Sequence, residues 1–125
     1  MSSQKGRPVI LVMDDDEAIL RLMKIRLEGM GLDVLLESDG QKGLQIIEST
    51  AVSAVLLDLN MGSTSGFDLL PKIKKMKPNL PVIMVTGSHD EAEARKTVEL
   101  GAWDYVTKPI DFQYLSNILI FPEGP

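Results

Sequence analysis

Four short stretches of this sequence place residues that bind phosphate or a divalent cation at the end of an apolar run. Each apolar run is typical of a strand that is buried on both faces of a parallel sheet. The carboxyl ends of such strands lie along one edge, so the residues at these ends meet in one crevice. Three aspartates, a threonine and a lysine gathered there are the set that a Mg²⁺-dependent aspartyl phosphorylation site requires. The stretches are MDDD at 13–16, LLD at 56–58, VTG at 85–87 and VTKP at 106–109.

The three consecutive aspartates follow the first apolar run directly. Asp16 is expected to cap the next helix, but one cap does not need three carboxylates. Acidic groups concentrated at a buried strand end repel one another, so without a counter-ion the pKa of at least one of them should rise. A hard divalent cation relieves this repulsion, which makes Asp14 and Asp15 candidate Mg²⁺ ligands.

Asp58 ends the most apolar run, and the next helix begins too far behind it to need it as a cap. Its carboxylate oxygen can attack a phosphoryl donor to form an acyl phosphate. Lys108 would neutralise charge during that transfer, and a cis peptide bond to Pro109 would be compatible with its place in the chain. Thr86 is also an ordinary strand residue, but the small Gly87 after it leaves space for a phosphoryl group beside its hydroxyl.

Apolar runs alternate with amphipathic segments along the whole chain, which is the pattern of βαβ units and an open, doubly wound sheet. A polar, flexible loop is expected at 60–66, and Pro71 should kink the third helix or mark its later start. The fourth helix has Ala94 and Val98 as its main core contacts, which predicts a lightly held element. Strands are expected at 9–13, 33–36, 54–58, 81–86 and 104–107. Helix caps are expected at Asp16, Ser38, Ser65, Ser88 and Asp111.

Composition narrows the classes of protein that this chain can represent. Its 125 residues suit one domain with its own core, and the absence of cysteine excludes disulfides and Cys-ligated zinc. A net charge of −5 without any basic block argues against nucleic-acid binding by this domain. The opening segment lacks the apolar core of a signal peptide, and no apolar run approaches membrane-spanning length. We therefore expect a cytoplasmic domain that does not attach to a membrane.

Taken together, the motifs at these spacings resemble the receiver (response-regulator) domain of two-component signalling, CheY-like, over roughly residues 8–119. The resemblance implies a flavodoxin-like (βα)5 fold, a doubly wound five-stranded parallel sheet of order 2-1-3-4-5 with five helices. It also implies that Asp58 is the phosphoacceptor. The Mg²⁺ (or Mn²⁺) would be held by Asp14, Asp15, Asp58 and the main-chain carbonyl of Asn60.

The same resemblance assigns roles in switching. Thr86 and Lys108 would contact the phosphoryl group, and the Tyr105 ring would change rotamer together with Thr86. A histidine kinase or histidine phosphotransfer protein would donate the phosphoryl group, and the domain would catalyse only its own phosphorylation and dephosphorylation. Phosphorylation would repack the face of the fourth helix, fifth strand and fifth helix, through which a homodimer could form.

The receiver domain is expected at 8–121, between a flexible tail at 1–7 and a tail at 122–125. It would work within a larger response regulator or hybrid kinase, or as a stand-alone receiver. A haloacid-dehalogenase-like phosphohydrolase would need Asp-x-Asp, whereas 58–60 reads Asp-Leu-Asn and no cap domain is inserted. A pseudo-receiver that serves only as an interaction module is disfavoured by the intact acidic set.

Overall fold

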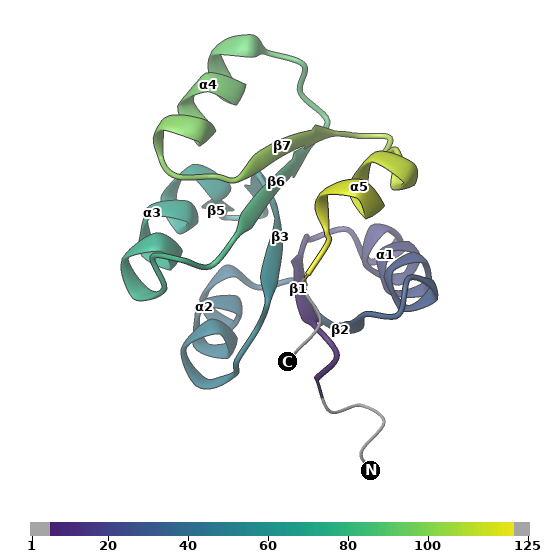
Figure 1. Cartoon of the computed structure of the whole chain (residues 1–125). Coiled ribbons are helices and arrows are strands. Elements are labelled where there is room, and N and C mark those ends of the chain that lie inside the picture. The colour runs from purple at the N-terminus through teal and green to yellow at the C-terminus, as the bar shows by residue number, and fades with distance from the viewer. Residues whose placement is uncertain (1–5, 122–125) are drawn as a thin grey trace.

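Five parallel strands form the central sheet of this computed structural model, which describes residues 6–121 (Figure 1). Their order is β2-β1-β3-β6-β7, which confirms the predicted doubly wound arrangement 2-1-3-4-5 of the main strands. The predicted tail at 122–125 and most of the tail at 1–7 lie outside the described residues. The strands are β1 (Val9–Met13), β2 (Asp33–Glu37), β3 (Ala54–Asp58), β6 (Val82–Thr86) and β7 (Asp104–Thr107).

Helices cover both faces of this sheet, as Figure 1 shows. Side chains of α1 and α5 pack in one apolar cluster, and side chains of α2 and α3 pack in the other. Alternate residues of β1 enter opposite clusters, with Ile10 on the α1 side and Leu11 on the α2 side. Within residues 6–121, no helix has the length and apolar character needed to cross a membrane. The helices are α1 (Glu17–Gly29), α2 (Gly40–Ser49), α3 (Gly66–Met76), α4 (Glu91–Glu99) and α5 (Phe112–Ile118).

The helix caps were predicted correctly at three of five positions. Asp39 rather than Ser38 caps α2, because its carboxylate accepts two first-turn N–H groups at 2.8 and 3.1 Å. Asp90 rather than Ser88 caps α4, and the Ser88 hydroxyl instead accepts from the N–H of Asp90 at 3.2 Å. A carboxylate also interacts favourably with the helix dipole, which a hydroxyl cannot match. The confirmed caps are Asp16, Ser65 and Asp111.

The segment after Asp58 is more regular than the predicted flexible loop. Two short strands, β4 (Asn60–Met61) and β5 (Thr64–Ser65), pair there as an antiparallel hairpin. Gly62 makes the turn with a φ of 63°, a conformation that favours glycine.

Helix α3 begins at residue 66 and has Pro71 inside it, so the predicted alternative that Pro71 marks a later start of the third helix is wrong. The buried leucine and isoleucine side chains of α3 outweigh the hydrogen bond that the proline removes.

Two helical residues whose spacing predicts that they face the core are exposed instead. Leu22 recurs with Ile19, Met23 and Leu27 at helical spacing in α1 but is 43% exposed, whereas Leu20 is buried. Val98 of α4 is 58% exposed, whereas Thr97 is the one fully buried residue of that helix. The Thr97 hydroxyl donates to the carbonyl of Ala94 within the same helix at 2.8 Å, so its burial leaves no polar group unpaired. Helix α4 therefore presents little apolar surface to the sheet.

Candidate active site

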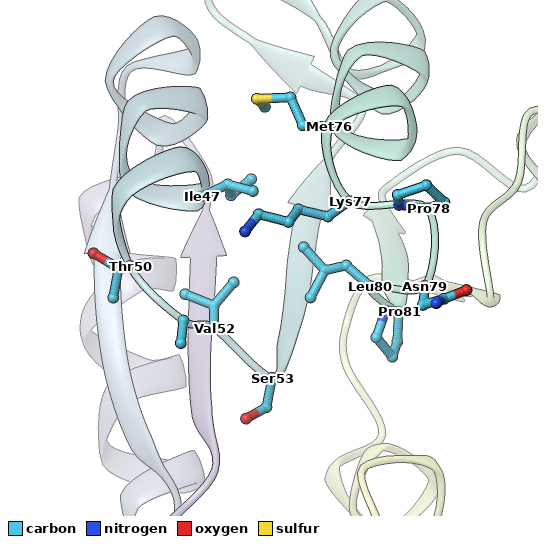
Figure 2. A pocket seen from close by; sticks show the side chains of 11 residues that line it. Ile47, Thr50, Val52, Ser53, Met76, Lys77, Pro78, Asn79, Leu80 and Pro81 are labelled. Atoms are coloured by element: carbon cyan, nitrogen blue, oxygen red, sulfur yellow. The ribbon is translucent and has the colours of Figure 1, made fainter.

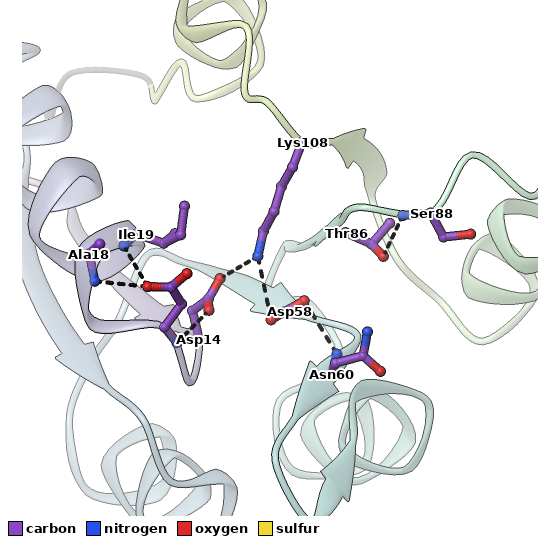
Figure 3. A network of polar contacts seen from close by, with 9 residues as sticks. Asp14, Ala18, Ile19, Asp58, Asn60, Thr86, Ser88 and Lys108 are labelled. Atoms are coloured by element: carbon purple, nitrogen blue, oxygen red, sulfur yellow. Dashed lines mark hydrogen bonds and ion pairs between the residues drawn. The ribbon is translucent and has the colours of Figure 1, made fainter.

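The carboxyl ends of four neighbouring strands bring the predicted site residues together (Figure 3). Asp14 follows β1, Asp58 ends β3, Thr86 ends β6 and Lys108 follows β7. The Lys108 Nζ lies 3.0 Å from Asp14 Oδ2 and 3.5 Å from Asp58 Oδ2. Two carboxylates from separate strands therefore share one ammonium group, although 94 residues separate Lys108 from Asp14.

Three carboxylates gather at this edge of the sheet. Asp14, Asp15 and Asp58 each offer an oxygen, and these oxygens lie within 4.8 Å of one another. Asp14 and Asp58 are buried, and Asp15 is exposed. Main-chain groups orient the two buried carboxylates, because Asp14 accepts from the N–H of Asp16 at 2.9 Å and Asp58 from that of Asn60 at 3.3 Å. Clustered carboxylate oxygens are the ligands that hard cations such as Mg²⁺ prefer, so this donor set fits the predicted metal.

The electrostatics of the cluster are dominated by burial. Burial, together with the charge of Asp14, raises the pKa of Asp58 from 3.8 to about 6, although the Asn60 N–H and Lys108 counteract this rise. The predicted rise of at least one carboxyl pKa is thus found at Asp58. Burial alone would lower the pKa of Lys108, but its contacts with Asp14 and Asp58 outweigh burial and raise the pKa. Lys108 is therefore a permanently charged partner of the carboxylates.

Thr86 and Tyr105 are both hydrogen-bonded to the main chain of one residue, Ser88. The buried Thr86 hydroxyl accepts from the Ser88 N–H at 3.2 Å, and the Tyr105 hydroxyl donates to the Ser88 carbonyl at 3.1 Å. Burial first, and then the charge of Glu93, raise the pKa of the Tyr105 hydroxyl, which keeps it a donor at neutral pH. The Lys108 N–H donates to the Thr86 carbonyl at 2.7 Å, so the ends of β6 and β7 are tied directly together.

Close backbone contacts fix the floor of the site. Gly66, the first residue of α3, donates its N–H to the carbonyl of Leu59 at 2.7 Å. A Cβ at this position would lie 2.6 Å from the carbonyl oxygen of Asp58 and 2.8 Å from the Cα of Leu59, so only glycine fits. Sequence reasoning missed this role, although a glycine directly behind a Ser cap was the available signal. The peptide bond between Lys108 and Pro109 is cis, the isomer that the sequence left open.

Comparison with known proteins agrees with this geometry. The chain matches the family model of the response regulator receiver domain over residues 10–120. It is 35% identical over 100 residues to the alkaline phosphatase synthesis transcriptional regulatory protein PhoP of Bacillus subtilis (strain 168), covering 80% of the chain and 42% of PhoP. A CheY-like receiver domain protein from Methanospirillum hungatei JF-1 has a TM-score of 0.85 at 32% identity, with 90% of each chain covered.

A further solved structure is a response regulator protein from Burkholderia pseudomallei with a phosphorylated aspartic acid, calcium ion and citrate. It has a TM-score of 0.81 at 25% identity, and the match covers 86% of this chain and 64% of that one.

Because the family model spans nearly all of the described residues, the chain belongs to the response regulator receiver domains. It is therefore a phosphorylation-dependent signalling switch rather than a classical enzyme. Domains of this class interact with histidine kinases or phosphotransfer proteins. The chain spans less than half the length of the PhoP relative that it matches.

Proposed function

We propose that Asp58 accepts a phosphoryl group from the phosphohistidine of a histidine kinase or histidine phosphotransfer protein. A carboxylate oxygen of Asp58 attacks the phosphorus atom, the P–N bond breaks, and the donor imidazole keeps the bonding electron pair. The observation that carries this proposal is a buried carboxylate at a strand end, 3.5 Å from Lys108 Nζ and clustered with two further carboxylates. The domain catalyses only this transfer and the later hydrolysis of its own acyl phosphate.

A divalent cation fits the acidic cluster. Asp14, Asp15 and Asp58 would hold Mg²⁺ (or Mn²⁺) through their carboxylates, and Asn60 through its main-chain carbonyl. Bound there, the cation supplies positive charge that offsets the phosphoryl oxygens. The similar response regulator from Burkholderia pseudomallei contains a phosphorylated aspartic acid and a calcium ion. Its content supports the proposal that this chain also binds a divalent cation.

Lys108 and Thr86 would detect the modification. A phosphoryl group on Asp58 adds charge beside Lys108, whose ammonium would then pair with a phosphoryl oxygen. The Thr86 hydroxyl accepts from the Ser88 N–H and still has its own proton to donate to another phosphoryl oxygen, so a turn of Thr86 toward that oxygen would pull on Ser88. Because Tyr105 holds the carbonyl of the same Ser88, the change would pass to the face formed by α4, β7 and α5.

Intact-mass measurement with acetyl phosphate and Mg²⁺ tests this proposal. The expected result is one added phosphoryl group on the parent protein and none on Asp58→Asn, a matched variant of nearly the same size. The absence of both an adduct and any response to beryllofluoride would refute the proposal and favour a pseudo-receiver. Rapid multi-turnover release of phosphate from small phosphate esters would instead favour a haloacid-dehalogenase-like hydrolase.

The longer PhoP relative supports a receiver that works within a larger response regulator, with a stand-alone receiver as the alternative. We propose a cytoplasmic location and no nucleic-acid contact by this acidic domain itself. The α4–β7–α5 face would form a homodimer on phosphorylation, because Val98 of α4 and Trp103, directly before β7, are 58% and 62% exposed. Sedimentation with and without beryllofluoride tests the dimer, and an unchanged sedimentation coefficient would contradict it.

A further inference from the structure

A cavity of about 410 Å³ lies where β3 and β6 begin (Figure 2). The phosphorylation site lies at the other ends of these strands. The end of α2 and the segment leading into β3 form one wall, and the end of α3 and the segment leading into β6 form the other. This volume lies within the range of small-molecule binding sites. The apolar part of the lining consists of Ile47, Ala51, Val52, Met76, Pro78, Leu80 and Pro81.

The wall between α3 and β6 is held in place by its own hydrogen bonds. Leu80 donates its N–H to the carbonyl of Lys77 at 3.0 Å, and its carbonyl accepts from Lys74 Nζ at 2.7 Å. The Pro81 carbonyl accepts a main-chain N–H of β3 at 3.0 Å, and neither Pro78 nor Pro81 has an N–H to donate. The cavity is therefore pre-formed, which lowers the entropy cost of ordering it when a ligand binds. A ligand would contact this wall mainly through apolar groups.

One charged side chain lines this apolar cavity. Among the described residues that line the cavity, Lys77 is the only ionisable one, and none has a carboxylate. Figure 2 shows its side chain extending across the space between α2 and the 78–81 segment. Within residues 6–121, Lys77 makes no side-chain hydrogen bond or ion pair. A mainly apolar cavity with a single cation in its lining is complementary to a molecule with an apolar body and one negative charge.

We propose that this cavity binds an amphipathic monocarboxylate. The apolar body of the ligand lies against Ile47, Val52 and Leu80, and its carboxylate pairs with the Lys77 ammonium. A ligand that binds only the folded protein stabilises it by mass action, here at the ends of β3 and β6 remote from Asp58. The site is independent of phosphorylation, because none of the residues that form it belongs to the acidic cluster.

Octanoate is a suitable probe, titrated into the whole chain while main-chain amide signals are followed by NMR. Saturating shifts are expected at Val52, Asn79 and Leu80. Octylamine has the same chain length and the opposite charge, and 1-octanol is neutral, so both should bind at least about fivefold more weakly. Lys77→Gln should weaken octanoate binding by about fivefold, whereas the matched variant Lys72→Gln, on α3 but outside the cavity, should leave it unchanged.

Three results would overturn the proposal. These are shifts that do not saturate, saturating shifts that map to another part of the chain, and equal affinity for the anionic, cationic and neutral probes. The Asp58→Asn variant provides a separate control, since it should bind octanoate as the parent protein does. A chain that fails to phosphorylate but binds octanoate would therefore refute the proposed function and leave this inference intact.

Discussion

The unfavourable ionisation of Asp58 gives a sharp prediction for protein stripped of divalent cations. Asp58→Asn removes the negative charge but keeps an oxygen that can accept from the Asn60 N–H. Because folding raises the pKa of this carboxyl from 3.8 to about 6, the folded protein is penalised wherever Asp58 must ionise. The asparagine variant should therefore be more stable than the parent protein at neutral pH.

The size of the effect follows from the two pKa values. Each pKa unit corresponds to about 1.4 kcal/mol, so full ionisation penalises folding by about 3 kcal/mol. Well below pH 3.8 the carboxyl is protonated in both the folded and the unfolded protein, and the penalty vanishes. It grows as the pH rises and is complete above about pH 7. The advantage of Asp58→Asn should thus increase from about 0.5 kcal/mol at pH 4 to about 3 kcal/mol at pH 7.5.

Urea unfolding of both proteins at pH 4 and pH 7.5, in the presence of a chelator, measures this difference. The exposed Asp15→Asn is the matched control and should change the free energy of unfolding by less than about 0.5 kcal/mol at either pH. Saturating Mg²⁺ at pH 7.5 should stabilise the parent protein more than Asp58→Asn, since the cation offsets the same charge. A pH-independent difference between parent and Asp58→Asn would refute the reasoning.

Three further substitutions test a close contact, a buried ion pair and a helix cap, each by the free energy of unfolding in denaturant. Gly66→Ala should lower this free energy by about 2 kcal/mol, because its Cβ would meet main-chain atoms under the site. Gly29→Ala, whose Cβ would have no atom within 4 Å, should not destabilise the protein, and equal effects of the two would contradict the steric argument. Lys108→Met should lower the free energy of unfolding by about 2 kcal/mol without divalent cations, because it leaves two buried carboxylates without their ammonium partner. Saturating Mg²⁺ should restore much of the lost stability, and no rescue would count against a cation site there. Asp39→Ala should lose about 1 kcal/mol and Ser38→Ala almost nothing; the reverse order would show that the serine is the cap.

The strands and the meeting of the site residues were predictable because both depend on patterns that the chain carries locally. Continuous apolar runs located the five main strands to within one residue, and parallel pairing then required their carboxyl ends to share an edge. Choices between adjacent polar residues were not predictable in this way. Ser38 and Asp39 can both cap a helix, and only the path of the backbone into α2 decides between them.

Features that depend on three-dimensional proximity had no local signal. The shared contact of Lys108 with Asp14 and Asp58 depends on strand order, which a single sequence does not contain. The rotation of α4 about its axis buries Thr97 and exposes Val98. This rotation depends on how the helix packs against β7 and α3. A helix with so few apolar residues offers no periodic stripe from which that rotation could be derived.

The sparse apolar contact of α4 has a thermal consequence. Heat-capacity changes on moving an element scale with the apolar area that becomes hydrated, at about 0.45 cal/K/mol for each Å². With Thr97 as the one fully buried residue of α4, displacing this helix would hydrate little apolar surface. The equilibrium between two positions of α4 should then vary with temperature without the curvature that governs unfolding of the core. A single enthalpy would then describe the α4 equilibrium over temperatures at which the stability of the core already curves.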